Sequence, residues 1–359
     1  MSNLEARPKP LLCAERLEAA RPMAQVIEPR DVPLGGIRAM TVRRTLPTRD
    51  RSLIGAWCFL DHYGPDDVAL TGGMKVPPHP HTGLQTVSWL FSGEVEHKDS
   101  AGHQAMVRPG ELNLMTAGRG INHSEFSTPE TTILHGVQLW TALPDAHRFT
   151  DPGFEHYVPK PVTGPGYELR VFLGSLAGDE SPVRTFSPLL GAEVTVCAGS
   201  TAVFATNIDF EHGVLIDAGT AQVAGREVQP GQLAYLAPGM NRLEITAGDS
   251  ASRLLLLGGK PLGESITMWW NFIGRSHDEI EHFRSAWQEL LEEDAVSRHS
   301  RLDAVSRHSR PEGGSRHDDL VEPAAAVRRD PAPAQFGGLV GADALPAPEL
   351  PNVTLKPRR

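Results

Sequence analysis

The stretch that decides the fold runs from His79 to Glu125 and reads HPHTGLQTVSWLFSGEVEHKDSAGHQAMVRPGELNLMTAGRGINHSE. Its apolar runs are short, and Gly, Pro or Asp separates each run from the next. Runs of about four to eight residues with closely spaced turn signals are typical of β-strands in a barrel or sandwich. We therefore predict an all-β protein. The same pattern continues in TILHGVQLW (132–140), YELRVFLG (167–174), AVFATNIDF (202–210), GVLIDAG (213–219) and SRLLLLGG (252–259).

The chain also carries a weak internal repeat. The segments VRPGELNLMTAGRG (107–120) and VQPGQLAYLAPGMN (228–241) both start with Val-x-Pro-Gly-x-Leu and end in a glycine turn. Each lies downstream of a strand-like run that ends in glycine. Repetition on this scale fits two similar β-barrels in tandem, joined by a connector over residues 143–160.

One helix is marked after the second barrel. Ser276 and Glu279 form a capping box, and apolar residues then recur at helical spacing to about Glu293. Beyond it, DAVSRHSR (294–301) is repeated at 303–310 within a segment rich in Ala, Pro, Arg and Asp, a composition that predicts disorder. We therefore expect a flexible arm (1–22), a first barrel with its connector (23–160), a second barrel with a terminal helix (161–293) and a disordered tail (294–359).

Charge and composition narrow the function classes. The chain has 359 residues, with 34 Lys and Arg against 44 Asp and Glu and a net charge of −10, so we expect no direct nucleic-acid binding. Three widely spaced cysteines favour a reducing compartment over a disulfide scaffold. No apolar stretch approaches the ~18 residues of a membrane span, and the N-terminus lacks a signal-like apolar region. We expect a cytoplasmic protein without membrane contact, and a monomer because no heptad pattern is visible.

Two pairs of candidate metal ligands share one spacing. His79 and His81 are two residues apart, and so are His123 and Glu125. Along an extended chain, side chains two residues apart point to the same face. On neighbouring strands these pairs would direct three imidazoles and one carboxylate at one spot, a donor set that suits Fe, Mn, Ni, Cu or Zn. Taken singly, an HxH pair is more often two surface or hydrogen-bonding histidines, and the spacing names no reaction.

Other polar residues near the pairs have a weaker signal. His97 and Asp99 lie beside a turn, and we expect them to be solvated or structural. His135 and Gln138 have opposite parity on one predicted strand, so only one of them can face a barrel interior.

The role of Gln85 depends on how the strand continues after His81. If the strand stays regular, Gln85 shares the face of the candidate ligands and can support them by hydrogen bonding. Trp89 and Phe91 would then form an apolar wall on that face, although core packing explains them equally well.

The stretch 79–125 closely resembles the pirin family, which shows HPH, G, TV, a strand ending in Gly, xHxDS, PG and MTAGxGxxHSE in this order. The resemblance continues through GVQLWTALPDAHRFTDPGFEHY (136–157) and faintly at MWWNFIGRSHDEI (268–280), covering about Val26 to Trp287. It implies a bicupin, that is, two barrels of the cupin superfamily with metal only in the N-terminal one.

Carried over residue by residue, the family's metal ligands fall on His79, His81, His123 and Glu125, and the resemblance most favours iron(II) among the divalent transition metals. The second half, over residues 163–262, has only one histidine and no HxH, in agreement with a metal-free second cupin. Many members have Glu where this chain has Gln85, and an amide cannot exchange a proton at neutral pH. Any acid–base role of that earlier carboxylate is therefore in doubt here.

The resemblance implies two functions of different classes. The first is a quercetin 2,3-dioxygenase-type reaction, in which O₂ cleaves a flavonol or related enolisable aromatic with loss of carbon monoxide. Glu125 is then the best candidate for the catalytic base. The second is a non-enzymatic regulator that binds a partner protein and senses metal or redox state through the charge at the barrel mouth. The four intact ligand positions lead us to favour the enzyme.

Overall fold

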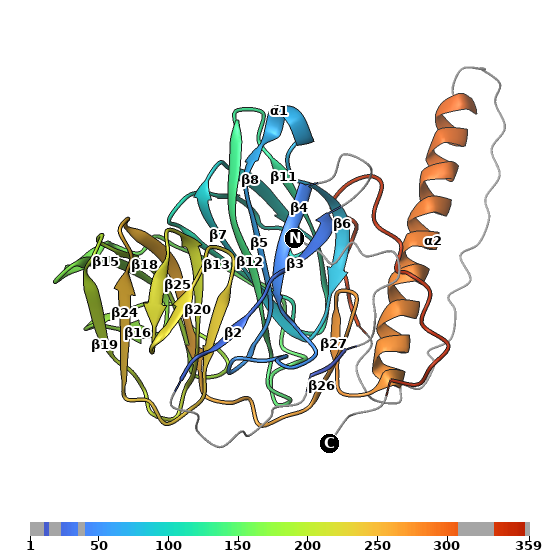
Figure 1. Ribbon diagram of the computed structural model, residues 1–359. Coiled ribbons are helices and arrows are strands. Elements are labelled where there is room, and N and C mark those ends of the chain that lie inside the picture. The colour runs from blue at the N-terminus through green and yellow to red at the C-terminus, as the bar shows by residue number, and fades with distance from the viewer. Residues whose placement is uncertain (1–10, 14–22, 35–39, 308–333, 356–359) are drawn as a thin grey trace.

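The computed structural model describes residues 11–13, 23–34, 40–307 and 334–355 of the chain. Within them, β-strands form two barrels that lie side by side, and a long helix lies beside the first barrel (Figure 1). The predicted all-β, two-barrel fold with a C-terminal helix is confirmed. Across these ranges no helix has both the length and the apolar character needed to cross a membrane.

The first barrel combines two antiparallel sheets and one short helix. Its elements are β3 (Arg30–Leu34), β4 (Met40–Leu46), β5 (Trp57–Asp67), α1 (Val68–Thr71), β6 (Lys75–His81), β7 (Leu84–Ser92), β8 (Val95–Asp99), β9 (Gln104–Val107), β10 (Leu112–Thr116), β11 (Ile121–Ser127), β12 (Ile133–Ala142) and β13 (Gly153–Tyr157). The seven-stranded sheet has the order β13-β10-β7-β12-β5-β4-β3, and the four-stranded sheet has the order β6-β11-β8-β9.

The second barrel is built in the same way. Its strands are β2 (Gln25–Ile27), β14 (Val162–Gly164), β15 (Tyr167–Leu173), β16 (Ser175–Leu176), β17 (Asp179–Glu180), β18 (Leu189–Val196), β19 (Thr201–Ala205), β20 (Glu211–Ala218), β21 (Ala221–Val223), β22 (Arg226–Val228), β23 (Leu233–Leu236), β24 (Arg242–Ala247) and β25 (Ser252–Gly259). The sheets have the orders β14-β15-β18-β25-β20-β23-β2 and β19-β24-β21-β22, and β16 pairs with β17.

These orders make the two barrels equivalent strand by strand. In the large sheets β7 lies between β10 and β12, as β20 lies between β23 and β25; in the small sheets β6 and β11 correspond to β19 and β24. The repeated Pro-Gly turn precedes β10 and β23. There Gly110 (φ 72°) and Gly231 (φ 86°) adopt the left-handed backbone that glycine tolerates without steric cost. One strand crosses between the halves, because β2 precedes the first barrel in sequence but pairs with β23.

The two large sheets pack face to face, so their central strands are buried on both sides. On β7, Val87 and Trp89 point away from the first barrel's interior and join Leu215 and Leu255 in an apolar cluster between the barrels. Leu90, with the opposite parity, lies in the interior. Burial stabilises side chains of this size by about 1.5–3 kcal/mol each. This double burial explains why β7 carries large apolar residues at both odd and even positions.

A buried polar network also joins the barrels. Asp217 of β20 accepts hydrogen bonds from His62 Nε2 at 2.8 Å and His135 Nε2 at 2.6 Å, and its second oxygen accepts one from Arg253 Nε at 2.6 Å. Burial alone would raise the pKa of Asp217, but the hydrogen bonds from His135 and His62 outweigh it and lower that pKa. Burial lowers the pKa of His62. At pH 7 an ionised carboxylate therefore meets a neutral His62.

We expect Asp217→Asn to lower the free energy of unfolding by about 3 kcal/mol, because the buried donors lose the charge they surround.

The wild type should lose stability in acid. The stability contributed by Asp217 is present above its unfolded pKa of about 3.9 and is lost as the pH falls below it. His62, whose pKa is also lowered by folding, loses its contribution as the pH falls below about 6.5. Urea unfolding of the wild type at about pH 7, pH 4 and pH 2.5 follows the loss of the His62 contribution and then of the Asp217 contribution. A variant as stable as the wild type at pH 7 would contradict this role of Asp217.

The C-terminal helix and a hairpin lie beside the first barrel, and the helix packs on the hairpin (Figure 1). The hairpin consists of β26 (Ile266–Trp269) and β27 (Phe272–Gly274), and β1 (Leu11–Cys13) pairs with β26. Helix α2 (His277–Arg307) passes its expected end near residue 293, so the first copy of the DAVSRHSR repeat is helical. The second copy runs into residues 308–333, which lie outside the described residues, as do residues 1–10 and 14–22 of the expected arm.

The prediction of a disordered tail over 294–359 is wrong for residues 334–355, which we call the C-terminal segment. Its Phe336, Ala347 and Leu355 are buried in one apolar cluster with Trp287 of α2. Trp287 Nε1 donates a hydrogen bond to Leu345 O at 2.8 Å. The Ala- and Pro-rich composition of the segment predicted disorder. Its spaced apolar residues nevertheless pack on the apolar stripe of α2, a surface that the composition of the segment does not reveal.

Candidate metal centre

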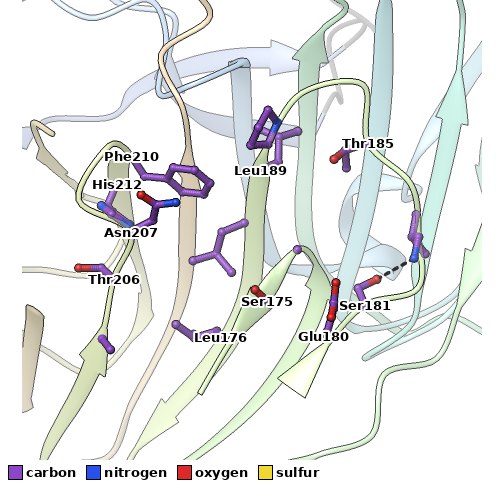
Figure 2. Close-up of a pocket in the computed structure, with 15 residues that line it drawn as sticks. Ser175, Leu176, Glu180, Ser181, Thr185, Leu189, Thr206, Asn207, Phe210 and His212 are labelled. Carbon is purple, nitrogen blue, oxygen red and sulfur yellow. Dashed lines mark hydrogen bonds between the residues drawn. The ribbon is translucent and has the colours of Figure 1, made fainter. Parts of the chain in front are cut away.

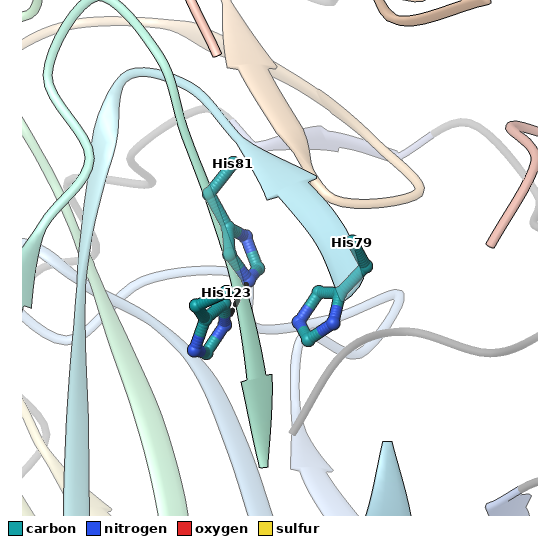
Figure 3. Close-up of side chains that lie close together, drawn as sticks. All are labelled: His79, His81 and His123. Carbon is teal, nitrogen blue, oxygen red and sulfur yellow. Dashed lines mark hydrogen bonds between the residues drawn. The ribbon is translucent and has the colours of Figure 1, made fainter. Parts of the chain in front are cut away.

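Three of the predicted ligands converge inside the first barrel. β6 and β11 are antiparallel neighbours, with His79 opposite His123 and His81 opposite Ile121. The ring centroids of His79 and His123 lie 4.3 Å apart, and the ring of His81 lies 5.0 Å from each of them (Figure 3). All three side chains are fully buried. The two-residue spacing therefore places both histidines of β6 on the inner face, as an extended strand requires.

Backbone carbonyls orient the two histidines of β6. His79 Nδ1 donates to Pro77 O at 2.8 Å, and His81 Nδ1 donates to Asn271 O, in the turn between β26 and β27, at 3.2 Å. Donation from Nδ1 leaves Nε2 unprotonated in each neutral ring. His79 Nε2 is buried and has no hydrogen-bond partner within the described residues. Both rings thus present a lone pair to the interior.

A relay of side chains orients His123 in the same way. His123 Nδ1 lies 3.3 Å from His97 Nδ1, and His97 Nε2 lies 3.3 Å from Asp99 Oδ2. Burial alone would raise the pKa of Asp99, but the hydrogen bonds from His97 and from the His103 backbone N–H outweigh it and lower that pKa. Ionised Asp99 accepts the proton of His97 Nε2, so His97 Nδ1 accepts from His123. His123 Nε2 is then left unprotonated.

The expectation that His97 and Asp99 are solvated is wrong, whereas the alternative expectation of a structural role fits the support that they give His123. Both are at most 4% exposed, and His97 touches a candidate ligand. The signal for them was present in the sequence, because His97 and Asp99 are also two residues apart and share one face of β8. We gave this spacing little weight because both residues lie beside a turn.

We expect His97→Leu to weaken metal binding by about 10- to 100-fold, since the proton donor of His123 loses its acceptor. His97→Gln, which keeps an acceptor, should recover most of the affinity. Competition with a chelator of known affinity measures the change. The matched control is His103→Leu, because His103 touches Asp99 but not His123. Wild-type affinity in His97→Leu would remove His97 from the site.

The nitrogen atoms of the site fit a transition metal ion. Nε2 of His81 and Nε2 of His123 lie 3.1 Å apart, and neither carries a proton in the tautomers above. Two lone pairs at this distance repel each other unless a cation lies between them. Two nitrogens bound at right angles to one ion, with bonds of about 2.1 Å, lie ~3 Å apart, which agrees with the distance between these two atoms. Burial lowers the pKa of His79 to about 3 and those of His81 and His123 well below the usual value. The rings are therefore neutral, the form that binds metals.

The fourth predicted ligand, Glu125, lies on the same strand as His123. A bulge between the two residues shifts the register against β6. Glu125 is 1% exposed, and a carboxylate oxygen lies within 4.8 Å of ligand atoms of His123 and His97. Ser88 Oγ lies 3.5 Å from Glu125 Oε1 but donates at 2.9 Å to Gln138 Oε1. The single hydroxyl proton of Ser88 thus serves Gln138 rather than Glu125.

The expectation for Gln85 is wrong. Gln85 shares one face of β7 with Val87 and Trp89, but this is the outer face that packs against the second barrel. Its amide donates to Thr116 and accepts from Thr141. The strand does not continue regularly from β6, because the chain turns at Gly83 (φ 68°), where a Cβ would lie 2.4 Å from Ile273 O. For β12 the parity argument holds: Gln138 contacts Ser88 of the interior, and His135 faces Asp217.

The equivalent strands of the second barrel carry apolar residues. Phe204 of β19 and Leu243 and Ile245 of β24 lie in the apolar core of that barrel. No cluster of three candidate ligands in the described part of the chain belongs wholly to the second barrel. The interior that brings three candidate ligands together is thus that of the first barrel.

The C-terminal segment supports the candidate ligand strands from outside. The side chain of Asn122, next to His123, donates to Phe336 O at 2.7 Å and to Gly338 O at 2.9 Å. Leu345 N donates to Pro78 O, next to His79, at 2.8 Å. Both ligand strands are therefore fixed by a segment more than 200 residues away in sequence.

Two cupin barrels, of which the first carries the converging histidines, define a bicupin. The chain matches the family model for pirin over residues 39–141 and that for the pirin C-terminal cupin domain over residues 191–291. It belongs to the pirin family.

Relatives and solved structures agree with this assignment. The chain is 43% identical over 278 residues to a Pseudomonas aeruginosa protein named "Putative quercetin 2,3-dioxygenase", covering 77% of this chain and 86% of that protein. It is 37% identical to a pirin-like protein of Caulobacter vibrioides, covering 69% of this chain and 88% of that protein. The crystal structure of quercetin 2,3-dioxygenase from Acinetobacter baumannii matches with a TM-score of 0.75 and 33% identity, covering 93% of this chain and 98% of that chain.

Proposed function

We propose that the protein is a metal-dependent dioxygenase of the quercetin 2,3-dioxygenase type, with His79, His81, His123 and Glu125 as metal ligands. The observation that carries this proposal is the approach of two buried imidazole nitrogens, Nε2 of His81 and Nε2 of His123, to 3.1 Å inside the first barrel. The names of the Pseudomonas aeruginosa relative and the Acinetobacter baumannii structure support the reaction type.

Three imidazoles and one carboxylate suit iron(II), and other divalent transition metals use the same donors. When bound, such an ion supplies Lewis acidity that lowers the pKa of a coordinated hydroxyl group. The relay through His97 and Asp99 keeps His123 in the required tautomer, and the Asn271 carbonyl does the same for His81.

Glu125 acts as the base in this proposal. Its carboxylate accepts the 3-hydroxyl proton of a flavonol or a related enolisable aromatic, which gives the enolate. The enolate then reacts with O₂; both oxygen atoms enter the product, the ring opens and one ring carbon leaves as carbon monoxide.

Oxygen uptake tests the proposal. Protein loaded anaerobically with Fe(II) should consume O₂ when quercetin is added and release carbon monoxide in equal amount. If iron is bound and quercetin causes no uptake, the enzymatic proposal fails, and the regulatory function with a protein partner becomes the better explanation.

A further inference from the structure

The second barrel has a cavity at the end that corresponds to the candidate metal centre of the first. The cavity has a volume of about 430 Å³ and lies between the segment from β16 to the start of β18 and the end of β19 with the start of β20 (Figure 2). The equivalent strand of the first barrel, β6, ends with His79 and His81. Small-molecule sites commonly have volumes of about 300–1,000 Å³. Both barrels therefore offer a site at the same end, but with different chemistry.

Most of the accessible cavity wall is polar, a smaller part is apolar, and the wall contains no positive charge. Leu176 and Leu190 line it and also belong to the core of the second barrel, and Phe210 lies beside them. Glu180 is the one acidic residue among the lining residues, and none of them is Lys or Arg. An anion would find no counter-charge here, whereas the smaller apolar part of the wall can contact the ring of a neutral molecule and the polar part can bind its polar groups.

Polar groups of the wall have hydrogen-bonding capacity left for a ligand. Asn207 Oδ1 accepts from Asp209 N at 3.0 Å, which leaves the two amide N–H groups of Asn207. Glu180 can accept hydrogen bonds on the side of the cavity opposite Asn207 and His212 (Figure 2). Thr185 and Thr206 already donate to Ser187 O and Met240 O. Among these groups, Asn207 and Glu180 therefore keep hydrogen-bonding capacity for a ligand.

His212 is the unusual group in this wall. It is 2% exposed and lies on the inner face of β20 with Val214 and Ile216, and its Nε2 has no hydrogen-bond partner within the described residues. Burial lowers its pKa to about 4, so the ring is neutral at pH 7. A buried polar group without a partner destabilises a fold. A partner from outside the chain would compensate for this cost.

We propose that this cavity binds a small, neutral, hydroxylated aromatic molecule, in the simplest case a phenol. The ring packs against Phe210 and Leu176, the hydroxyl donates its proton to the imidazole of His212, and Asn207 donates to the ligand oxygen. The ligand touches no residue of the candidate metal centre, so this site does not depend on the proposed reaction of the first barrel.

Binding of 4-fluorophenol to the full-length protein tests the proposal. Fluorine NMR should show a saturable shift with the wild type, and His212→Leu should weaken binding by about tenfold or more, because the hydrogen-bond acceptor is lost. His282→Leu, the same substitution at an exposed position on α2, should bind as the wild type does. Because Nε2 of His212 has no internal partner, His212→Leu should keep or raise the melting temperature.

Two results would overturn the site. One is the absence of saturable binding to the wild type up to the solubility limit of the probe. The other is equal binding by the wild type and a folded His212→Leu variant, which would place the probe elsewhere. If His212→Leu loses stability, Asn207→Leu at the rim of the cavity provides the second variant, and it should also weaken binding.

Discussion

Replacement of His79 with Ala is expected to lower metal affinity by more than about 100-fold and to abolish quercetin-dependent oxygen uptake. Loss of an orienting partner alone costs about 10- to 100-fold in affinity, and His79 would supply the ligand atom itself. Its Nε2 is buried and without a partner in the described chain, so the fold loses no hydrogen bond at that atom. The substitution does remove the hydrogen bond from His79 Nδ1 to Pro77 O, which links residues only two apart in one strand, and the metal-free variant should stay folded.

The change in melting temperature on addition of Fe(II) under anaerobic conditions measures this loss, because a ligand that binds only the folded state stabilises it. The wild type should show a clear upward shift and His79→Ala almost none. The control is His282→Ala, which changes an exposed histidine on α2. An equal shift in wild type and His79→Ala would show that the metal binds elsewhere.

Replacement of Glu125 with Gln should lower turnover by at least about 100-fold while the protein keeps most of its metal. Gln keeps the size and one oxygen donor of Glu but cannot accept a proton at neutral pH, and general-base catalysis contributes about 10²–10⁴-fold. Glu125→Ala should lose both metal and turnover, because no donor atom remains. Metal content and the rate of oxygen uptake, measured on the same samples, separate the two roles.

Ser88→Ala is the matched control for Glu125. Ser88 lies 3.5 Å from Glu125 Oε1 but donates to Gln138, so its loss should change turnover by less than about tenfold. Wild-type turnover in Glu125→Gln would remove Glu125 from the proton transfer and leave it, at most, a role in holding the metal.

The spacing of residues along the sequence predicted which side chains share one face of a strand and where the chain turns. The two-residue spacing of His79 and His81 put both rings on one face, because side chains alternate along any extended strand. The same rule held for His135 and Gln138, which face opposite sides of β12. The Pro-Gly turns revealed the two equivalent barrels for a similar reason, since a left-handed turn is a property of a few adjacent residues.

Spacing could not show which face of a strand is the inner one. Gln85 lies on the predicted face of β7 together with Trp89, but the turn at Gly83 directs that face toward the second barrel. Likewise, the composition of residues 334–355 predicted disorder because it says nothing of the apolar stripe of α2. Each of these outcomes depends on a surface that another part of the chain provides.

The sequence by itself therefore determined the all-β class, the repeat of two barrels and the identity of the candidate ligands, because strand alternation and turn geometry act over a few residues. Only the tertiary structure decided how those ligands are oriented. His81 depends on the carbonyl of Asn271, 190 residues away, and His123 depends on His97 from a neighbouring strand. Hydrogen bonds between segments far apart in sequence exist only once the barrels have closed, and the sequence pattern around either partner does not record them.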